Sequence, residues 1–212
     1  MTLEIKHWGQ HFTLYPHYGA YWKEFDALLI ADIHIGKDGH FRKAGIAVPG
    51  HITQTDLQVL QLLIDACPAK QVIFMGDLFH SAMNKDCLQL KHLIEKNKNL
   101  NFVLIKGNHD IIDEAQILDL GIDKIETELI FNDVRLTHIP LFDKEKKNIA
   151  GHYHPAIKMR GKSRMGLKIP AFYFGHQQSI LPAFSQFSGH AIIKPEKGEQ
   201  VFIVIEGEVI AL

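Results

Sequence analysis

Three short apolar runs constrain the fold of this chain more than any other feature of its sequence. The runs are Ala27–Ala31, Val72–Met75 and Phe102–Ile105, and each has the length of a strand that is covered on both faces. Between them, leucine and isoleucine recur at helical spacing in Thr53–Ala66 and Lys85–Asn97. Strands that alternate with helices predict parallel pairing, so the sequence indicates an α/β fold built on a βαβαβ unit.

The second half of the chain has a different pattern. A short helix is expected over Glu114–Leu120, and two stretches of alternating apolar residues then flank a turn at Asn132 and Asp133. From there to Leu212 the sequence predicts strands and loops without a helix. It contains no repeat, low-complexity tract or linker, so residues 1–212 are expected to form a single domain.

Each apolar run ends in side chains that can bind a metal ion. The three run ends carry Asp32-Ile33-His34, Gly76-Asp77-Leu78-Phe79-His80 and Gly107-Asn108-His109-Asp110. Ligands bind at the carboxyl ends of parallel strands in open α/β sheets, so these groups are expected in one cleft. Two further motifs follow in the second half, a lone His138 and Gly151-His152-Tyr153-His154.

The spacing within these motifs also indicates metal binding. Residues two apart on an extended backbone point the same way, so Asp32 and His34 could bind one ion. His152 and His154 are also two apart, although a loop there could direct the two rings to different ions. Each motif alone is a weak signal of metal binding, but five motifs in this order are not expected to occur by chance. Carboxylate and imidazole donors without thiolates suit manganese, iron or zinc better than calcium.

The five motifs, in this order, resemble those of the calcineurin-like metallophosphoesterase family. The resemblance covers essentially the whole chain and implies a four-layer αββα sandwich with a centre of two divalent metal ions, with manganese favoured over iron or zinc. It implies that one ion is held by Asp32, His34, Asp77 and His154, and the other by Asp77, Asn108, His138 and His152. Asp77 would then bridge the two ions.

The same resemblance implies a reaction, the hydrolysis of a phosphoester by in-line attack of a hydroxide that bridges the metals. His109 would face the leaving group, and Asp110 would orient its ring. His80 stands where the family's double-strand-break repair nucleases have a catalytic histidine; alternatively, it hydrogen-bonds a ligand. Two divalent ions, two carboxylates and one hydroxide leave about one positive charge, which matches the single negative charge of a phosphodiester.

Several segments are similar to the DNA ligase-associated metallophosphoesterases of bacteria. They are Ile30–Lys37, Phe41-Arg42 with Gly45 and Val48-Pro49, Gly151–Pro155 and Leu181–Gly189. This similarity implies DNA as the substrate, in end processing or as an endonuclease in DNA repair, and a functional association with a DNA ligase and helicase system. His190 departs from the pattern, which has a second glycine there.

A basic run follows the last metal motif and agrees with a polyanionic substrate. Lys158, Arg160, Lys162, Arg164 and Lys168 fall in a stretch without an acidic residue, and Lys37 and Arg42 follow the first motif. These side chains, Lys168 apart, are our candidate substrate-binding residues. The alternative is a solvated basic edge strand.

Two rival functions remain open at this stage. One is a phosphomonoesterase or small-molecule phosphodiesterase with the same metals, and the other is a binding protein with a vestigial metal site. The formal charge of −1 predicts no global attraction to nucleic acid or membranes. Two cysteines argue against a disulfide framework, and no signal peptide or membrane span is visible, so a cytoplasmic protein is expected. The oligomeric state is left open.

Overall fold

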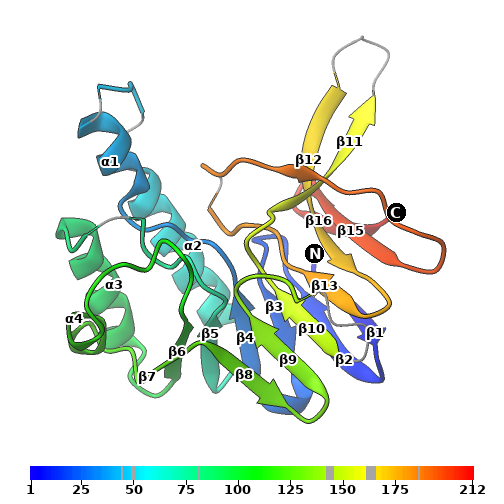
Figure 1. Ribbon diagram of the computed structural model, residues 1–212, viewed down its shortest axis with the longest axis horizontal. Coiled ribbons are helices and arrows are strands. Elements are labelled where there is room, and N and C mark those ends of the chain that lie inside the picture. Colours follow the sequence, from blue (N-terminus) through cyan, green and yellow to red (C-terminus); the bar gives the residue numbers. More distant parts are fainter. Residues whose placement is uncertain (44, 49–50, 81, 142–145, 161–165, 186) are drawn as a thin grey trace.

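The computed structural model contains two β-sheets that pack face to face, with helices beside the first sheet (Figure 1). It describes every residue of the chain except 44, 49–50, 81, 142–145, 161–165 and 186. The α/β class expected from the sequence is confirmed.

The first sheet has the order β1-β2-β3-β4-β5-β6-β7. Its strands are β1 (Leu3–His7), β2 (Gln10–Leu14), β3 (Ala20–Trp22), β4 (Ala27–Ile30), β5 (Gln71–Phe74), β6 (Asn101–Ile105) and β7 (Lys124–Glu126). Strands β1 to β4 pair antiparallel, whereas β4 to β7 pair parallel. The three apolar runs are therefore neighbours at the centre of the sheet, as predicted.

Four α-helices are present in the described residues. They are α1 (Lys37–Lys43), α2 (Ile52–Ala66), α3 (Lys85–Lys96) and α4 (Glu114–Asp119), and a 3₁₀ turn covers Lys23–Phe25. The last three were predicted, and Asn84 caps α3 by accepting a hydrogen bond from the backbone N–H of Asp86. Helix α1 was not predicted, because its sequence, KDGHFRK, lacks an apolar repeat.

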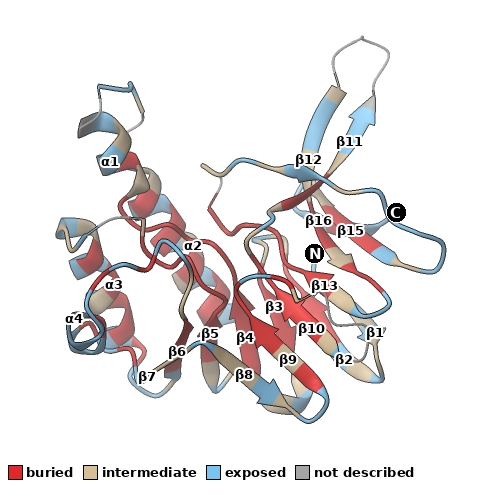
Figure 2. Ribbon diagram, in the orientation of Figure 1, coloured by how far each residue is buried: buried red, intermediate tan, exposed pale blue. Residues whose placement is uncertain are grey.

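Alternation along the central strands creates two separate apolar cores. Leu28 and Ile30 of β4 face the core under α2, α3 and α4, whereas Leu29 faces the core between the two sheets. In Figure 2 the central strands β4 to β6 of the first sheet are mostly coloured as buried. A strand covered on both faces must be apolar at every position, which explains the solid runs in the sequence.

The second sheet has the order β14-β11-β12-β13-β10-β9-β8. Its strands are β8 (Glu128–Phe131), β9 (Val134–Thr137), β10 (Lys147–Ala150), β11 (Pro155–Arg160), β12 (Gly166–Phe174), β13 (Gln178–Ile180) and β14 (Ala191–Ile192), and β15 (Gln200–Ile205) pairs with β12 and with β16 (Glu208–Ala211). The predicted turn joins β8 to β9. Strands β9, β10 and β13 pair parallel, which was not predicted. In Figure 2 these three strands of the second sheet are also mostly coloured as buried.

The sandwich of two sheets that the resemblance implied is confirmed, and its helices are unevenly distributed. Among the residues that the structure describes, all α-helices lie beside the first sheet (Figure 1). The outer face of the second sheet carries only a small apolar cluster around Ala171, Val201 and Ile203. The described chain thus forms three well-packed layers, because its second half supplies strands rather than amphipathic helices.

Two further features concern the whole described chain. No helix in it is both long and apolar enough to cross a membrane. Cys67 and Cys87 are buried and unpaired, which agrees with the expected absence of a disulfide framework.

Candidate metal centre

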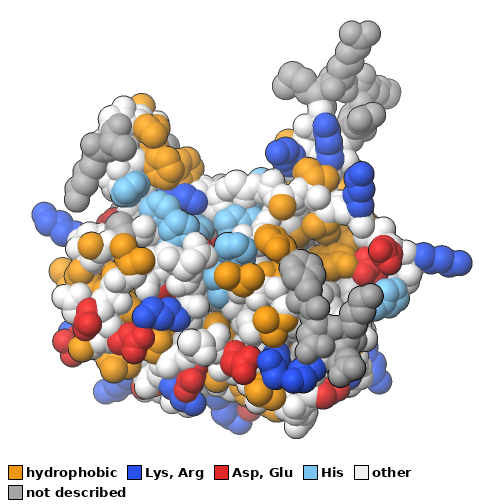
Figure 3. All heavy atoms as spheres, viewed as in Figure 1, with side chains coloured by type: hydrophobic (Ala, Val, Ile, Leu, Met, Phe, Trp, Pro, Cys, Tyr) orange, Lys and Arg blue, Asp and Glu red, His pale blue; other side chains and the backbone are white. Residues whose placement is uncertain are grey.

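The central strands of the first sheet place their polar ends side by side. The backbone N–H of Asp32 donates to the carbonyl of Gly76 (3.2 Å), and that of His34 donates to the carbonyl of Asp77 (2.9 Å). The backbone N–H of His109 donates to Oδ1 of Asp77 (2.9 Å). In the space-filling view, histidines gather in a band between α1 and the projecting β11–β12 hairpin (Figure 3).

Five residues of this region share an unusual backbone conformation. Asp32, His34, Asp77, His152 and His154 all have φ between +46° and +69°. Such values are uncommon outside glycine, and they cluster where tertiary contacts hold the backbone for function. Asp32 and His34 were expected to point the same way because they lie two apart on an extended strand. That reason is wrong, because neither residue has an extended backbone. The two side chains converge because the backbone turns left-handed at each of them.

One group of donors consists of Asp32, His34 and His154, whose ligand atoms all lie within 4.8 Å of one another. Nδ1 of His154 donates to the carbonyl oxygen of Gly189 (3.0 Å), so in a neutral ring the lone pair is on Nε2. That lone pair faces Oδ1 of Asp32 at 3.3 Å. Two acceptors that face each other across a gap of this size are stabilised by a cation between them.

A second group consists of Asp77, His138 and His152, again within 4.8 Å. Nδ1 of His138 donates to the carbonyl oxygen of Met75 (3.0 Å), which directs its Nε2 into the site. This Nε2 lies 3.3 Å from Oδ1 of Asp77 and 3.1 Å from Nδ1 of His152. Oδ1 of Asn108 lies 3.0 Å from it. Two ligands bound at right angles about 2.1 Å from a metal would lie about 3 Å apart, so this spacing suits an ion.

The electrostatics of both groups favour a bound cation. Burial opposes ionisation of Asp77, but its bonds with His138 and the His109 amide hold the pKa of the carboxyl at about 2. Burial lowers the pKa of His138, but Asp77 outweighs it and raises the pKa above its usual value. A position that attracts a proton in this way attracts a metal ion for the same reason.

His34 completes the donor set as a neutral ligand. Burial, aided by the Lys37 ammonium, lowers the pKa of its imidazole to about 2. Its Nδ1 is buried without a hydrogen-bond partner, and so is Oδ1 of Asp32. Unpaired buried donors and acceptors are costly, and a metal ion would satisfy such atoms. The residues present therefore fit two divalent cations, and the two donor groups are candidate metal sites.

Three glycines allow these side chains to approach one another. A Cβ added at Gly76 would lie 2.3 Å from Nδ1 of His138, and one at Gly107 would lie 2.3 Å from Oδ1 of Asp77. A Cβ at Gly151 would lie 2.6 Å from Oδ2 of Asp32. Only glycine fits at these points, which explains why a glycine precedes each of these motifs.

The candidate acid–base residues lie on the first-sheet side of the centre. His109 is exposed, and its ring stacks on that of His80, with centroids 5.0 Å apart and an interplanar angle of 27°. Burial lowers the pKa of His80 to about 4. Asp110 has a different role from the one expected, because its oxygens accept from the backbone N–H groups of Phe79 and Gly107 (both 2.8 Å). It joins two loops rather than orienting the His109 ring.

The candidate substrate-binding residues divide into two places. Lys37 lies half-buried at the start of α1, close enough for Asp32 and Asp77 to act on its charge. Arg42 pairs with Asp38 one helical turn away (2.8 Å). Lys158 is exposed on the hairpin, directly opposite Lys168. The side chain of Arg160 and the residues Lys162 and Arg164 lie outside the part that the structure describes.

Two contributors to the centre were missed at the sequence level. They are the backbone carbonyls of Met75 and Gly189, which fix the tautomers of His138 and His154. No residue type identifies a carbonyl acceptor, so only the fold could show them. Gly189 lies in the segment Leu181–Gly189, which resembles the ligase-associated proteins. That resemblance was the one signal in the sequence that this glycine matters, but it did not indicate its role.

Comparisons with known proteins agree with this geometry. The family model described as calcineurin-like phosphoesterase matches residues 25–166. A solved structure, the nuclease MPE of Pseudomonas putida, is similar over all of both chains, with 30% identity and a TM-score of 0.85. A protein of unknown function from Aquifex aeolicus, AQ665, has 18% identity and a TM-score of 0.41, over 60% of this chain and 78% of its own. No curated protein matches the chain.

Proposed function

Because this chain belongs to the calcineurin-like phosphoesterase family, we propose that it hydrolyses phosphodiester bonds in DNA at a centre of two divalent metal ions. The observation that carries the proposal is the pair of adjacent donor groups with lone pairs facing one another. Asp32, His34 and His154 would hold one ion. Asp77 and His138 would hold the other with His152 and Asn108, and Asp77 would bridge the two.

When bound, such ions act as Lewis acids and lower the pKa of a coordinated water. This oxygen and nitrogen donor set suits manganese, iron or zinc, and manganese is the ion we propose. The residues of the chain align the ligands, supply positive charge and donate a proton. The carbonyls of Met75 and Gly189 keep two imidazoles aligned, and Lys37 supplies positive charge beside the centre. His109, exposed beside Asp77, would donate a proton to the departing oxygen as the phosphorus–oxygen bond breaks.

DNA is proposed as the substrate on two grounds. A structure that is similar over the whole chain is named a nuclease. Lys158 and Lys168 also lie directly opposite each other on the hairpin, and like charges in this arrangement repel. A phosphate backbone bound along this face would relieve that repulsion. Figure 3 shows Lys and Arg side chains on the side of the histidine band from which the β11–β12 hairpin projects.

A cleavage screen on the purified protein, loaded with manganese, iron or zinc, tests the proposal. The substrates are single-stranded DNA, duplex DNA, nicked DNA, mononucleotides and bis(p-nitrophenyl) phosphate. We expect two metal ions per chain and cleavage of at least one DNA form in preference to mononucleotides. Preference for mononucleotides would instead establish a small-substrate phosphoesterase. Full metal content with no turnover of any substrate would contradict an enzymatic function.

A further inference from the structure

A pocket of about 330 Å³ lies beside the metal centre, and its lining includes none of the proposed metal ligands. Its lining combines Lys37 and Phe41 of α1 with Phe187, Ser188 and Gly189. These two segments are far apart in the chain, and both belong to the stretches that resemble the ligase-associated proteins. Its volume is at the lower end of the range for ligand pockets, which suits one small planar group.

The fold brings the two segments together in a specific way. After β13 the chain crosses from the second sheet to the first, with hydrogen bonds from the N–H of Leu181 to the carbonyl of Ala150 and from the N–H of Phe184 to the carbonyl of Ala31 (both 2.8 Å). This crossing delivers Phe187 to the side of α1. The Phe41 and Phe187 rings then meet edge to face, with centroids 5.6 Å apart and an interplanar angle of 88°.

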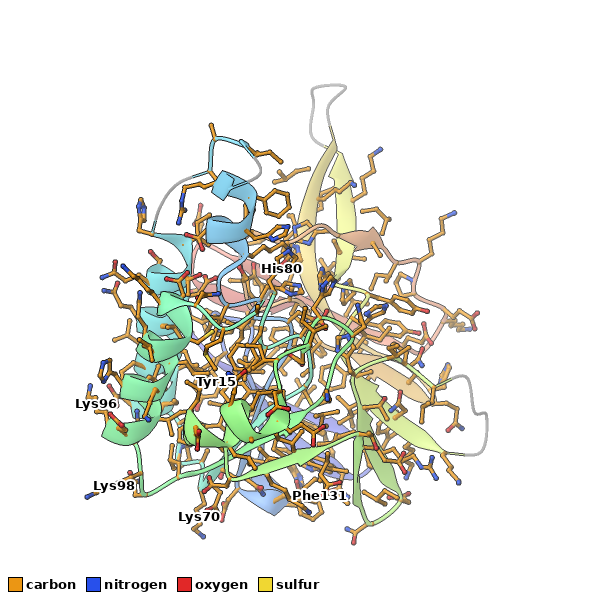
Figure 4. The ribbon with its side chains drawn as sticks, turned by 60° about the vertical axis from the view of Figure 1, so that its left-hand side comes forward. Tyr15, Lys70, His80, Lys96, Lys98 and Phe131 are labelled. Carbon is orange, nitrogen blue, oxygen red and sulfur yellow. The ribbon has the colours of Figure 1, made fainter. Side chains whose placement is uncertain are left out.

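Contacts of the lining residues link the pocket to the metal centre on two sides. On one side the Phe41 ring lies parallel to that of His80 (6.1 Å, 17°), and His80 in turn stacks on His109. On the other side the carbonyl of Gly189 accepts from Nδ1 of His154. Figure 4 shows His80 beneath α1, near the base of the β11–β12 hairpin. A group in the pocket would therefore be attached close to the phosphorus that reacts.

The lining also offers two polar groups to a ligand, the Ser188 hydroxyl and the Lys37 ammonium. The Ser188 hydroxyl is buried and has no hydrogen-bond partner among the described residues. Leaving a buried hydroxyl unpaired is costly, so a ligand that bonds it would be favoured. The Nζ atom of Lys37 lies 5.9 Å from the centroid of the Phe187 ring, in cation–π contact with it. The ammonium is therefore placed between the pocket and the metal centre.

From these observations we propose that the pocket binds the nucleobase of the nucleotide next to the scissile phosphate. The base would stack on Phe187 or Phe41 and accept or donate one hydrogen bond at Ser188, while Lys37 neutralises the adjoining phosphate. Aromatic stacking tolerates every base, so the pocket confers preference for nucleotides without reading sequence. The inference rests on the proposed phosphodiesterase function and adds the group by which the enzyme distinguishes nucleotides from other phosphodiesters.

The test compares esters that share one leaving group. The substrates are methyl p-nitrophenyl phosphate, thymidine 5′-(p-nitrophenyl) phosphate, its 3′ isomer, and the two corresponding esters of abasic deoxyribose. We expect the wild-type enzyme to prefer one thymidine ester over its abasic counterpart by about tenfold in kcat/KM, the scale of one stacked base. Any loss common to all the esters cancels in this ratio.

Phe187→Leu and Phe41→Leu should reduce that ratio to near one, and Ser188→Ala should reduce it about threefold. Phe131→Leu is the matched control, because Phe131 lies at the lower edge of the molecule in Figure 4, well away from His80. Its ratio should stay at the wild-type value. Ser188→Ala removes a single atom, so it gives a result even where a phenylalanine variant does not fold.

The outcomes separate this inference from the function on which it rests. Hydrolysis of the methyl ester with no preference for either thymidine ester would overturn the pocket and leave the phosphodiesterase standing. An unchanged ratio in the pocket variants would also overturn it, as would an equal fall in Phe131→Leu. No hydrolysis of any ester by metal-loaded protein would remove both proposals.

Discussion

In the parallel half of the molecule, β4 to β7, the donors follow strands that are connected by helices, whereas in the all-β half they follow strands that are joined without a helix among the described residues. Both halves nevertheless obey one rule. Asp32 and Asp77 follow β4 and β5, and His138 and His152 follow β9 and β10, which are also parallel neighbours. The carboxyl ends of parallel strands thus converge on the centre from both sheets.

The two halves differ in what they supply. The parallel half provides both carboxylates of the donor set, Asp32 and Asp77, and these are almost completely buried. The all-β half provides three imidazoles, His138, His152 and His154, and two of these are aligned by backbone carbonyls. We infer that the parallel half sets the charge of the centre and the all-β half sets its geometry. Four predictions test this division, from the largest effect to the smallest.

The largest effect is expected for Asp77→Asn in the parallel half. Loss of this charge should remove metal from both sites, because one carboxylate is proposed to serve two ions. Activity should fall by more than the roughly 10- to 100-fold that loss of an outer partner costs. Elemental analysis measures the metal content, and Asn108→Ala, which should empty mainly one site, is the comparison. Two fully occupied sites in Asp77→Asn would contradict the bridging role.

His109→Ala, also in the parallel half, should keep both metals but slow the chemistry. Hydrolysis of an alkyl phosphodiester should fall by about 100-fold or more, because the leaving oxygen then lacks its proton donor. A p-nitrophenyl ester should lose much less, since its leaving group is stable as an anion. Steady-state rates on the two esters, with metal content as the control, measure this difference. Equal losses on both would argue against proton donation by His109.

Gly151→Ala tests whether the all-β half sets geometry. The added methyl would collide with Oδ2 of Asp32 and lie 3.0 Å from the Cβ of Ala31, so the loop that carries His152 must shift. We expect kcat/KM to fall by roughly 10- to 100-fold, as for other losses of ligand support. Gly39→Ala is the matched control, because its new methyl would meet only atoms 3.8 Å away. Equal activity of both variants would show that the loop adapts without cost.

The smallest effect concerns the hairpin of the all-β half. Replacing Lys158 and Lys168 by glutamine should weaken oligonucleotide binding and flatten its dependence on salt, by about 0.7 to 0.9 in the log–log slope for each lost phosphate contact. The matched control replaces Lys96 and Lys98, which are exposed at the end of the molecule away from His80 (Figure 4). Binding titrations at several salt concentrations measure both slopes. Equal slopes in the two double variants would identify the hairpin as a solvated edge.

The parallel half and the candidate donors could be predicted from the sequence alone. Solid apolar runs separated by helical repeats have few alternatives, since a strand covered on both faces needs an apolar residue at every position. The order of the motifs after those runs then predicted which side chains would meet. The parallel pairing of β9, β10 and β13 was not predicted, because the residues described between these strands contain no amphipathic helix that would indicate it.

The way in which these residues meet depends on long-range contacts that the sequence pattern does not contain. The left-handed backbone at Asp32 and His34 is stabilised by contacts between strands, so extended spacing gave the wrong local geometry. The bonds of Asp110 to two loops, and the carbonyls that align His138 and His154, depend on backbone atoms that every residue carries. Phe41 and Phe187 meet because the chain crosses between the sheets after β13. Local periodicity in the sequence contains no information about such a long-range contact.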